Sequence, residues 1–204
     1  MKKIFGLLTL AVFALLTSGL ATPNDATLIR MPDGQNVLEF VGQVNNTPTT
    51  SQQFGYLSSI DGLNSIFSSS APQNETTALF TFVTNATTDR VISDGPLKII
   101  NRTGTTTIYL NSAPSSFNTP ATFSQGTPIQ VSTYRQQVIL NTTTNAFTTV
   151  HMNEISQTSQ FTLNGQLYQL GHQGKSFRTV YSGQANAPGL APSGWFSGYA
   201  VGAN

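Results

Sequence analysis

Apolar and polar residues alternate along most of this chain, from Val37 to Tyr181, and β-branched and aromatic residues are frequent within the alternation. A period of two places successive side chains on opposite faces of a strand, whereas an amphipathic helix needs a period near 3.6. Gly, Pro, Asn and Asp interrupt the alternation repeatedly, as they do at turns. The pattern therefore predicts an all-β fold.

The alternation divides into about ten short segments. In the first of them, Leu38, Phe40 and Val44 share one face. The segments are residues 37–44, 54–60, 78–84, 97–101, 105–111, 129–140, 147–152, 155–163, 166–170 and 177–181. So many short strands do not stay in one flat sheet. An antiparallel β-sandwich or jelly roll is the leading prediction, and a closed β-barrel is the alternative.

Two turns and one helix can be placed from local chemistry. Asn164-Gly165 lies between two apolar segments and is the pair that best tolerates positive φ at both central positions of a type I′ hairpin. Residues 141–145 indicate a longer hairpin loop. We expect at most one short helix, because only Leu57, Ile60, Leu63, Ile66 and Phe67 have near-helical spacing, and Gly62 interrupts it.

The two ends of the chain differ from the alternating part. Residues 1–21 combine Lys2 and Lys3 with an apolar run and a small-residue site ending in Ala21, the pattern of a cleaved signal peptide. We expect residues 22–182 to form a single all-β domain and the Gly-, Ala- and Pro-rich residues 183–204 to form an irregular tail. The leader predicts a secreted or periplasmic protein, with association at the cell surface also open, and it favours a bacterial source.

Composition excludes several functional classes. Without Lys2 and Lys3 the chain carries seven basic and eight acidic residues, and the bases are scattered, so no nucleic-acid partner is expected. No membrane span is expected after the leader is removed. The chain has no cysteine, which excludes disulfides and thiolate chemistry. With two histidines and no cysteine, no metal site and no cofactor are expected.

Catalytic candidates are few. His151 and Glu154 are the only histidine and carboxylate that lie close together in the sequence, but three residues of strand separation would direct them to opposite faces unless a bulge intervenes. His172 lies in a glycine-flanked stretch and is expected to be an exposed loop residue. A glycosidase-like pair of carboxylates from distant segments remains open, since such a pair needs no local motif.

Trp195, Phe196 and Tyr199 form the candidate ligand-binding group. Exposed aromatic rings provide a platform for the apolar face of a sugar, although the same rings could instead pack against the domain and anchor the tail. Only 8% of residues are charged, so an uncharged polar surface that binds or self-associates is expected. The sequence favours a secreted, non-enzymatic β-domain that binds carbohydrate or another surface component or forms a homo-oligomer. A small secreted hydrolase is the alternative.

Overall fold

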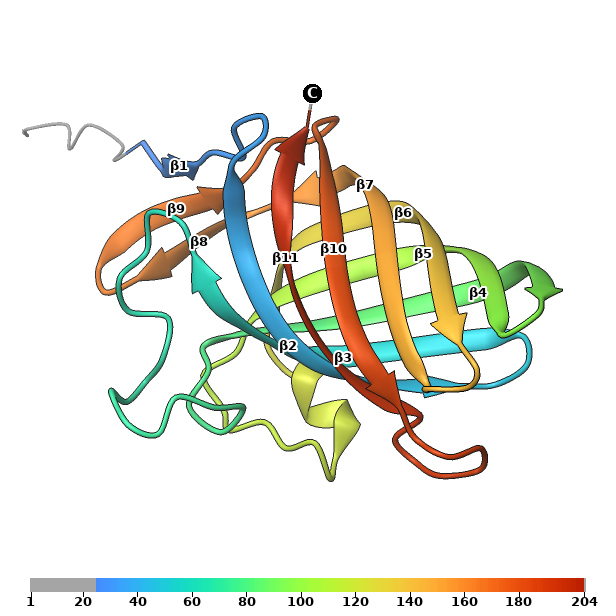
Figure 1. Cartoon of the computed structure of the whole chain (residues 1–204). Coiled ribbons are helices and arrows are strands. Elements are labelled where there is room, and N and C mark those ends of the chain that lie inside the picture. The colour runs from blue at the N-terminus through green and yellow to red at the C-terminus, as the bar shows by residue number, and fades with distance from the viewer. Residues whose placement is uncertain (1–24, 204) are drawn as a thin grey trace, which may run out of the picture.

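A computed structural model of the chain describes residues 25–203 and consists almost entirely of strands (Figure 1). The signal peptide predicted for residues 1–21 lies outside the described residues. The elements are β1 (Thr27–Ile29), β2 (Asn36–Asn46), β3 (Thr50–Ile60), β4 (Phe80–Asp94), β5 (Leu97–Leu110), the 3-10 helix η1 (Pro120–Ser124), β6 (Thr127–Asn141), β7 (Ala146–Thr158), β8 (Gln160–Leu163), β9 (Gln166–Leu170), β10 (Ser176–Ala185) and β11 (Gly194–Ala203).

Eight of the strands close into an antiparallel barrel in the order β10-β11-β2-β3-β4-β5-β6-β7. Each strand pairs with its sequence neighbour, except that β8 and β9 leave the barrel between β7 and β10. These two strands form a separate three-stranded sheet with β1, which pairs parallel to β9. The all-β prediction is confirmed, and the arrangement is the closed barrel given as the alternative to the sandwich.

The barrel strands are 10 to 15 residues long, so they are longer than the short segments expected from the sequence. One reason is that a glycine interpreted as a break can be a packing position. Gly104 lies in the middle of β5, where a Cβ would approach the hydroxyl oxygen of Tyr134 to 2.7 Å. The two segments predicted on either side of Gly104 are therefore one strand.

The tail predicted for residues 183–204 is wrong for the part that the structure describes. Residues 183–185 complete β10, and β11 closes the barrel by pairing with β10 and β2. Phe196 and Ala200 are buried on the inner face of β11. Gly198 lies between them, where a Cβ would come within 2.3 Å of the Tyr181 Cβ. Glycine is needed at position 198 because the paired strand β10 approaches too closely to leave room for a Cβ.

The near-helical spacing from Leu57 to Phe67 does not correspond to a helix in the structure. Leu57 and Ile60 are buried residues of β3, which runs on until Gly62 turns the chain with a φ of 80°. The one helix in residues 25–203 is η1, in a stretch expected to be a loop. No helix in that described part of the chain has the length and apolar character needed to cross a membrane.

The connections divide the barrel into two unlike ends. At one end, called the hairpin end here, all four connections join neighbouring strands directly: residues 47–49, 95–96, 142–145 and 186–193. At the other, the loop end, the connections are residues 61–79, 111–126 and 159–175. The last of these contains the predicted hairpin at Asn164-Gly165, which is confirmed by φ values of 50° and 79°. The predicted 141–145 hairpin loop is likewise confirmed between β6 and β7.

Candidate functional site

Strand alternation in β7 separates the two catalytic candidates. His151 is 4% exposed and faces the barrel interior, whereas Glu154 is exposed on the outer face. The register of β7 is regular between these residues, because its only irregularity opposite β6 lies beyond Glu154, where Ser132 pairs with Ile155. The structure therefore does not bring His151 and Glu154 together. The other histidine, His172, lies exposed in the loop before β10.

The Tyr181 hydroxyl is the centre of a polar group inside the barrel. It donates a hydrogen bond to Gln53 Oε1 at 2.9 Å and accepts one from Gln136 Nε2 at 2.9 Å. His151 Nε2 lies 3.0 Å away. A hydroxyl has one proton and two lone pairs, so Nε2 must be the protonated nitrogen of a neutral His151. Side chains from β3, β6, β7 and β10 are thus joined through one oxygen.

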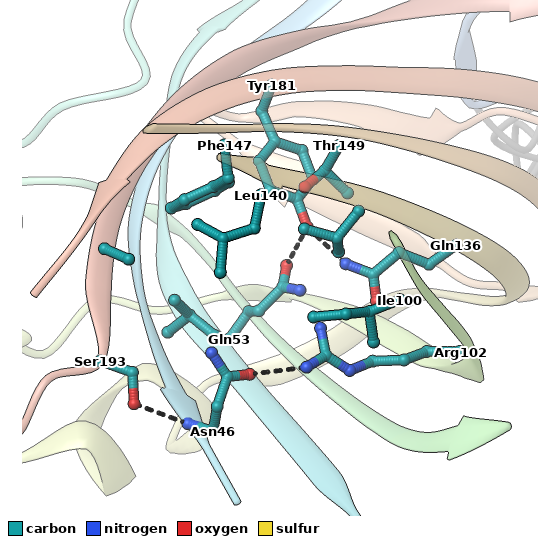
Figure 2. A pocket seen from close by; sticks show the side chains of 13 residues that line it. Asn46, Gln53, Ile100, Arg102, Gln136, Leu140, Phe147, Thr149, Tyr181 and Ser193 are labelled. Atoms are coloured by element: carbon teal, nitrogen blue, oxygen red, sulfur yellow. Dashed lines mark hydrogen bonds between the residues drawn. The ribbon is translucent and has the colours of Figure 1, made fainter. Parts of the chain in front are cut away.

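A cavity of about 60 Å³ at the hairpin end borders this polar group (Figure 2). Gln53, Gln136 and Tyr181 of the polar group line it, and we call these three residues its floor. The exposed Asn46 and the half-buried Ser193 mark its rim. The apolar wall consists of Val44, Ile100, Val138, Leu140, Phe147 and Ala185. We call this cavity the cup.

Arg102 of β5 lines the cup and is 6% exposed. Its Nη2 donates to Asn46 Oδ1 at 3.2 Å and its Nε to Thr88 Oγ1 at 3.3 Å. The backbone N–H of Asn46 in turn donates to Ser193 Oγ at 2.9 Å, as Figure 2 shows. Burial lowers the pKa of Arg102, but an arginine stays charged at neutral pH because its ordinary pKa is above 12.

A second cavity of about 50 Å³ lies on the other side of Tyr181 and Gln53, toward the loop end. His151 borders this cavity and stacks on Tyr134, with ring centroids 4.3 Å apart. Burial, and secondarily the charge of Arg102, lower the pKa of His151 to about 3. Burial raises the pKa of Tyr134 and of Tyr181. All three rings are therefore neutral at physiological pH.

Carboxylates are missing from the barrel interior. Of the eight acidic residues, all of which the structure describes, seven are exposed and Glu75 is half-buried in the 61–79 connection. No group of three or more residues that could ligate a metal occurs within residues 25–203. The interior can therefore bind through neutral hydrogen-bonding groups, one guanidinium and apolar walls, but it offers no carboxylate pair.

The aromatic candidates of β11 are divided between two faces. Phe196 packs inside the barrel against Tyr181, with ring centroids 4.7 Å apart. Trp195 and Tyr199 point outward and are 45% and 43% exposed. Trp195 also contacts Phe117 of the 111–126 connection, at 5.0 Å between ring centroids. The three residues therefore do not form one platform.

Sequence reasoning missed Arg102, Gln53, Gln136 and Tyr181. The sequence did contain part of the signal for Gln136. Gln136, Val138 and Leu140 are alternate residues of β6, so the prediction of a strand over 129–140 already placed a glutamine on the same face as two apolar residues. Without the barrel register, the Gln53 and Tyr181 strands could not be placed beside it.

Comparisons of this chain with protein-family models, with curated proteins and with solved structures give no match, so the geometry of the barrel is the basis for any functional proposal.

Proposed function

We propose that this is an exported, non-enzymatic binding protein whose ligand site is the cup at the hairpin end. The supporting observation is an apolar wall above a polar floor, inside a barrel with no interior carboxylate among the described residues. Ligand sites commonly combine apolar walls with a few polar groups that set orientation. Eight-stranded barrels are wide enough to hold one small ligand.

The floor is suited to binding because it is rigid. Tyr181 uses its proton and both lone pairs within the protein, so its position is determined by three other strands. Other polar groups of the floor are not fully used: the oxygen Oε1 of Gln136 is buried without a hydrogen-bond partner in the structure. A bound molecule could satisfy such groups without rearranging the barrel.

Two variants, each replacing an alanine by leucine, test this proposal. Ala185 lines the cup, whereas Ala146 on the neighbouring strand is exposed outside it. Sodium propionate, propionamide and 1-propanol are titrated separately, and amide chemical shifts are followed by NMR. We expect at least one probe to shift signals of cup residues in the native protein and in Ala146→Leu, but not in Ala185→Leu, where the added side chain fills the cup.

Two results would contradict the proposal. One is that none of the three probes shifts a cup signal in the native protein. The other is that Ala185→Leu responds as the native protein does, which would place the binding elsewhere.

A second candidate function is carbohydrate binding on the outer face of β11, favoured by the large exposed fractions of Trp195 and Tyr199. Four residues of strand separate them by about 13 Å. If this surface binds a polysaccharide, Trp195→Ala will abolish retention on that insoluble polysaccharide, and Met152→Ala, which removes another exposed apolar side chain of the outer face, will not. Equal retention of the two variants would exclude this function for the polysaccharides assayed.

A further inference from the structure

Arg102 places a positive charge inside the barrel without a negative partner. Its two hydrogen bonds go to the neutral oxygens of Asn46 and Thr88. None of the eight carboxylates is buried, and His151, Tyr134 and Tyr181 are neutral. A buried ion is normally paired, because taking an unpaired charge out of water is costly.

Two donors on residues that line the cup remain unused. Arg102 Nη1 makes no hydrogen bond to a residue of the described chain, and neither does Gln53 Nε2. Both residues line the cup. A guanidinium N–H and an amide N–H that line one cavity can donate to the two oxygens of a planar anion.

The rest of the cup limits what can accompany the anionic group. Its wall is formed by aliphatic side chains and one phenylalanine, so the remainder of the ligand should be apolar. Its volume of about 60 Å³ is smaller than the roughly 150 Å³ of a cavity that holds benzene. The space suits a few carbon atoms.

We infer that the cup is a receptor for short-chain monocarboxylates, with the carboxylate on Arg102 and the alkyl group against the apolar wall. This inference rests on the proposed function, and it specifies the charge and size of the ligand. Asn46 Oδ1 holds Arg102 Nη2 at the rim and leaves Nη1 unused.

Isothermal titration of the native protein with sodium propionate and with propionamide at constant ionic strength tests the charge requirement. The two probes have nearly the same shape, so they would bind with equal affinity if apolar contacts alone determined binding. We expect propionate to bind about tenfold more tightly or better, the effect of a charge-assisted hydrogen bond. Sodium chloride at the same concentration should not compete, and sodium octanoate should bind less well than propionate because its chain exceeds the cup.

Matched arginine variants locate the charge. Arg102→Gln keeps hydrogen-bond donors but removes the charge, and it should lose the preference for propionate. Arg135 is exposed on the outer face of the neighbouring β6, so Arg135→Gln should bind propionate as the native protein does. Arg102→Gln should fold, since it removes an uncompensated buried charge, and its urea unfolding curve checks this directly.

The outcomes separate the inference from the proposed function. Equal binding of propionate and propionamide, or a retained preference in Arg102→Gln, would overturn the inference while leaving the cup as a ligand site. Competition by chloride at equal strength would overturn the assignment to carboxylates. Absence of binding by every probe would overturn both proposals.

Discussion

The two ends of the barrel differ in how far their connections fill and cover the interior. At the loop end, long connections and the small β1-β9-β8 sheet supply apolar side chains to the core: Phe161 packs on Phe80 at 5.6 Å between ring centroids, and Leu170 is fully buried. At the hairpin end three of the four turns have only two to four residues, and the interior ends in the cup. We therefore expect stability to be concentrated at the loop end, whereas the proposed ligand site lies at the hairpin end.

The largest expected effect tests the stability half of this contrast. Phe80→Ala should lower the free energy of unfolding by about 3–5 kcal/mol, because a fully buried ring is lost from a packed region. Leu140→Ala at the cup should cost less than about 2 kcal/mol, since that side chain is half-buried and borders open space. Urea unfolding measures both. Equal losses in the free energy of unfolding for the two variants would contradict the difference between the two ends.

His151, which lies between the two ends of the barrel, should make the free energy of unfolding depend on pH. The pKa of His151 is about 3 in the folded protein and about 6.5 in an unfolded chain, so the unfolded state binds the extra proton first. Stability should therefore fall as pH decreases from about 6.5 toward 3, by about 1.4 kcal/mol per pH unit attributable to this group.

His151→Gln keeps a side-chain amide donor and does not titrate, so its stability should lack this part of the slope. His172→Gln changes the exposed histidine and should retain it. Urea unfolding at several pH values between 4 and 7 gives the three slopes. A native slope that persists in His151→Gln would show that another group is responsible.

A smaller effect is expected from the hydroxyl that joins four strands. Tyr181→Phe should cost about 1–3 kcal/mol, because Gln53, Gln136 and His151 each lose a buried partner. Tyr199→Phe should be nearly neutral, since Tyr199 is 43% exposed on the outer face. If the two variants have equal stability, Tyr181 does not hold the floor of the cup in the way described.

The smallest effect concerns the outer face. Trp195→Ala should cost about 1 kcal/mol through loss of its contact with Phe117, and propionate binding should be unchanged. Thermal unfolding and the same titration check both statements. A loss of propionate binding in this variant would move the ligand site from the interior to β11.

Much of the fold could be predicted because it depends on local chemistry. The alternation in residues 129–140 corresponds to β6, and Asn164-Gly165 forms the expected hairpin. The sequence did not distinguish a glycine that makes a turn from a glycine that is required because neighbouring atoms leave no room for a Cβ. A Cβ at Gly104 or Gly198 would collide with the backbone of a paired strand and with Tyr134 or Tyr181, and that relation depends on the pairing of the strands.

The candidate site was less predictable for a related reason. His151 was identified as a candidate, and Glu154, the one carboxylate near it in the sequence, was expected on the opposite strand face. The hydrogen-bond partner that the structure gives it is Tyr181, 30 residues along the chain. In the sequence Arg102 resembles the other scattered basic residues, and only the closed barrel shows that it is enclosed. Strand register decides which face a residue occupies, and closure of the barrel decides which face is the interior.

The most direct test of the account is a crystal structure of the protein grown with sodium propionate. We expect a carboxylate in the cup with an oxygen about 2.7–2.9 Å from the Arg102 guanidinium and its alkyl group against the apolar wall. An Arg102 paired with a protein carboxylate, or propionate bound only outside the barrel, would contradict it.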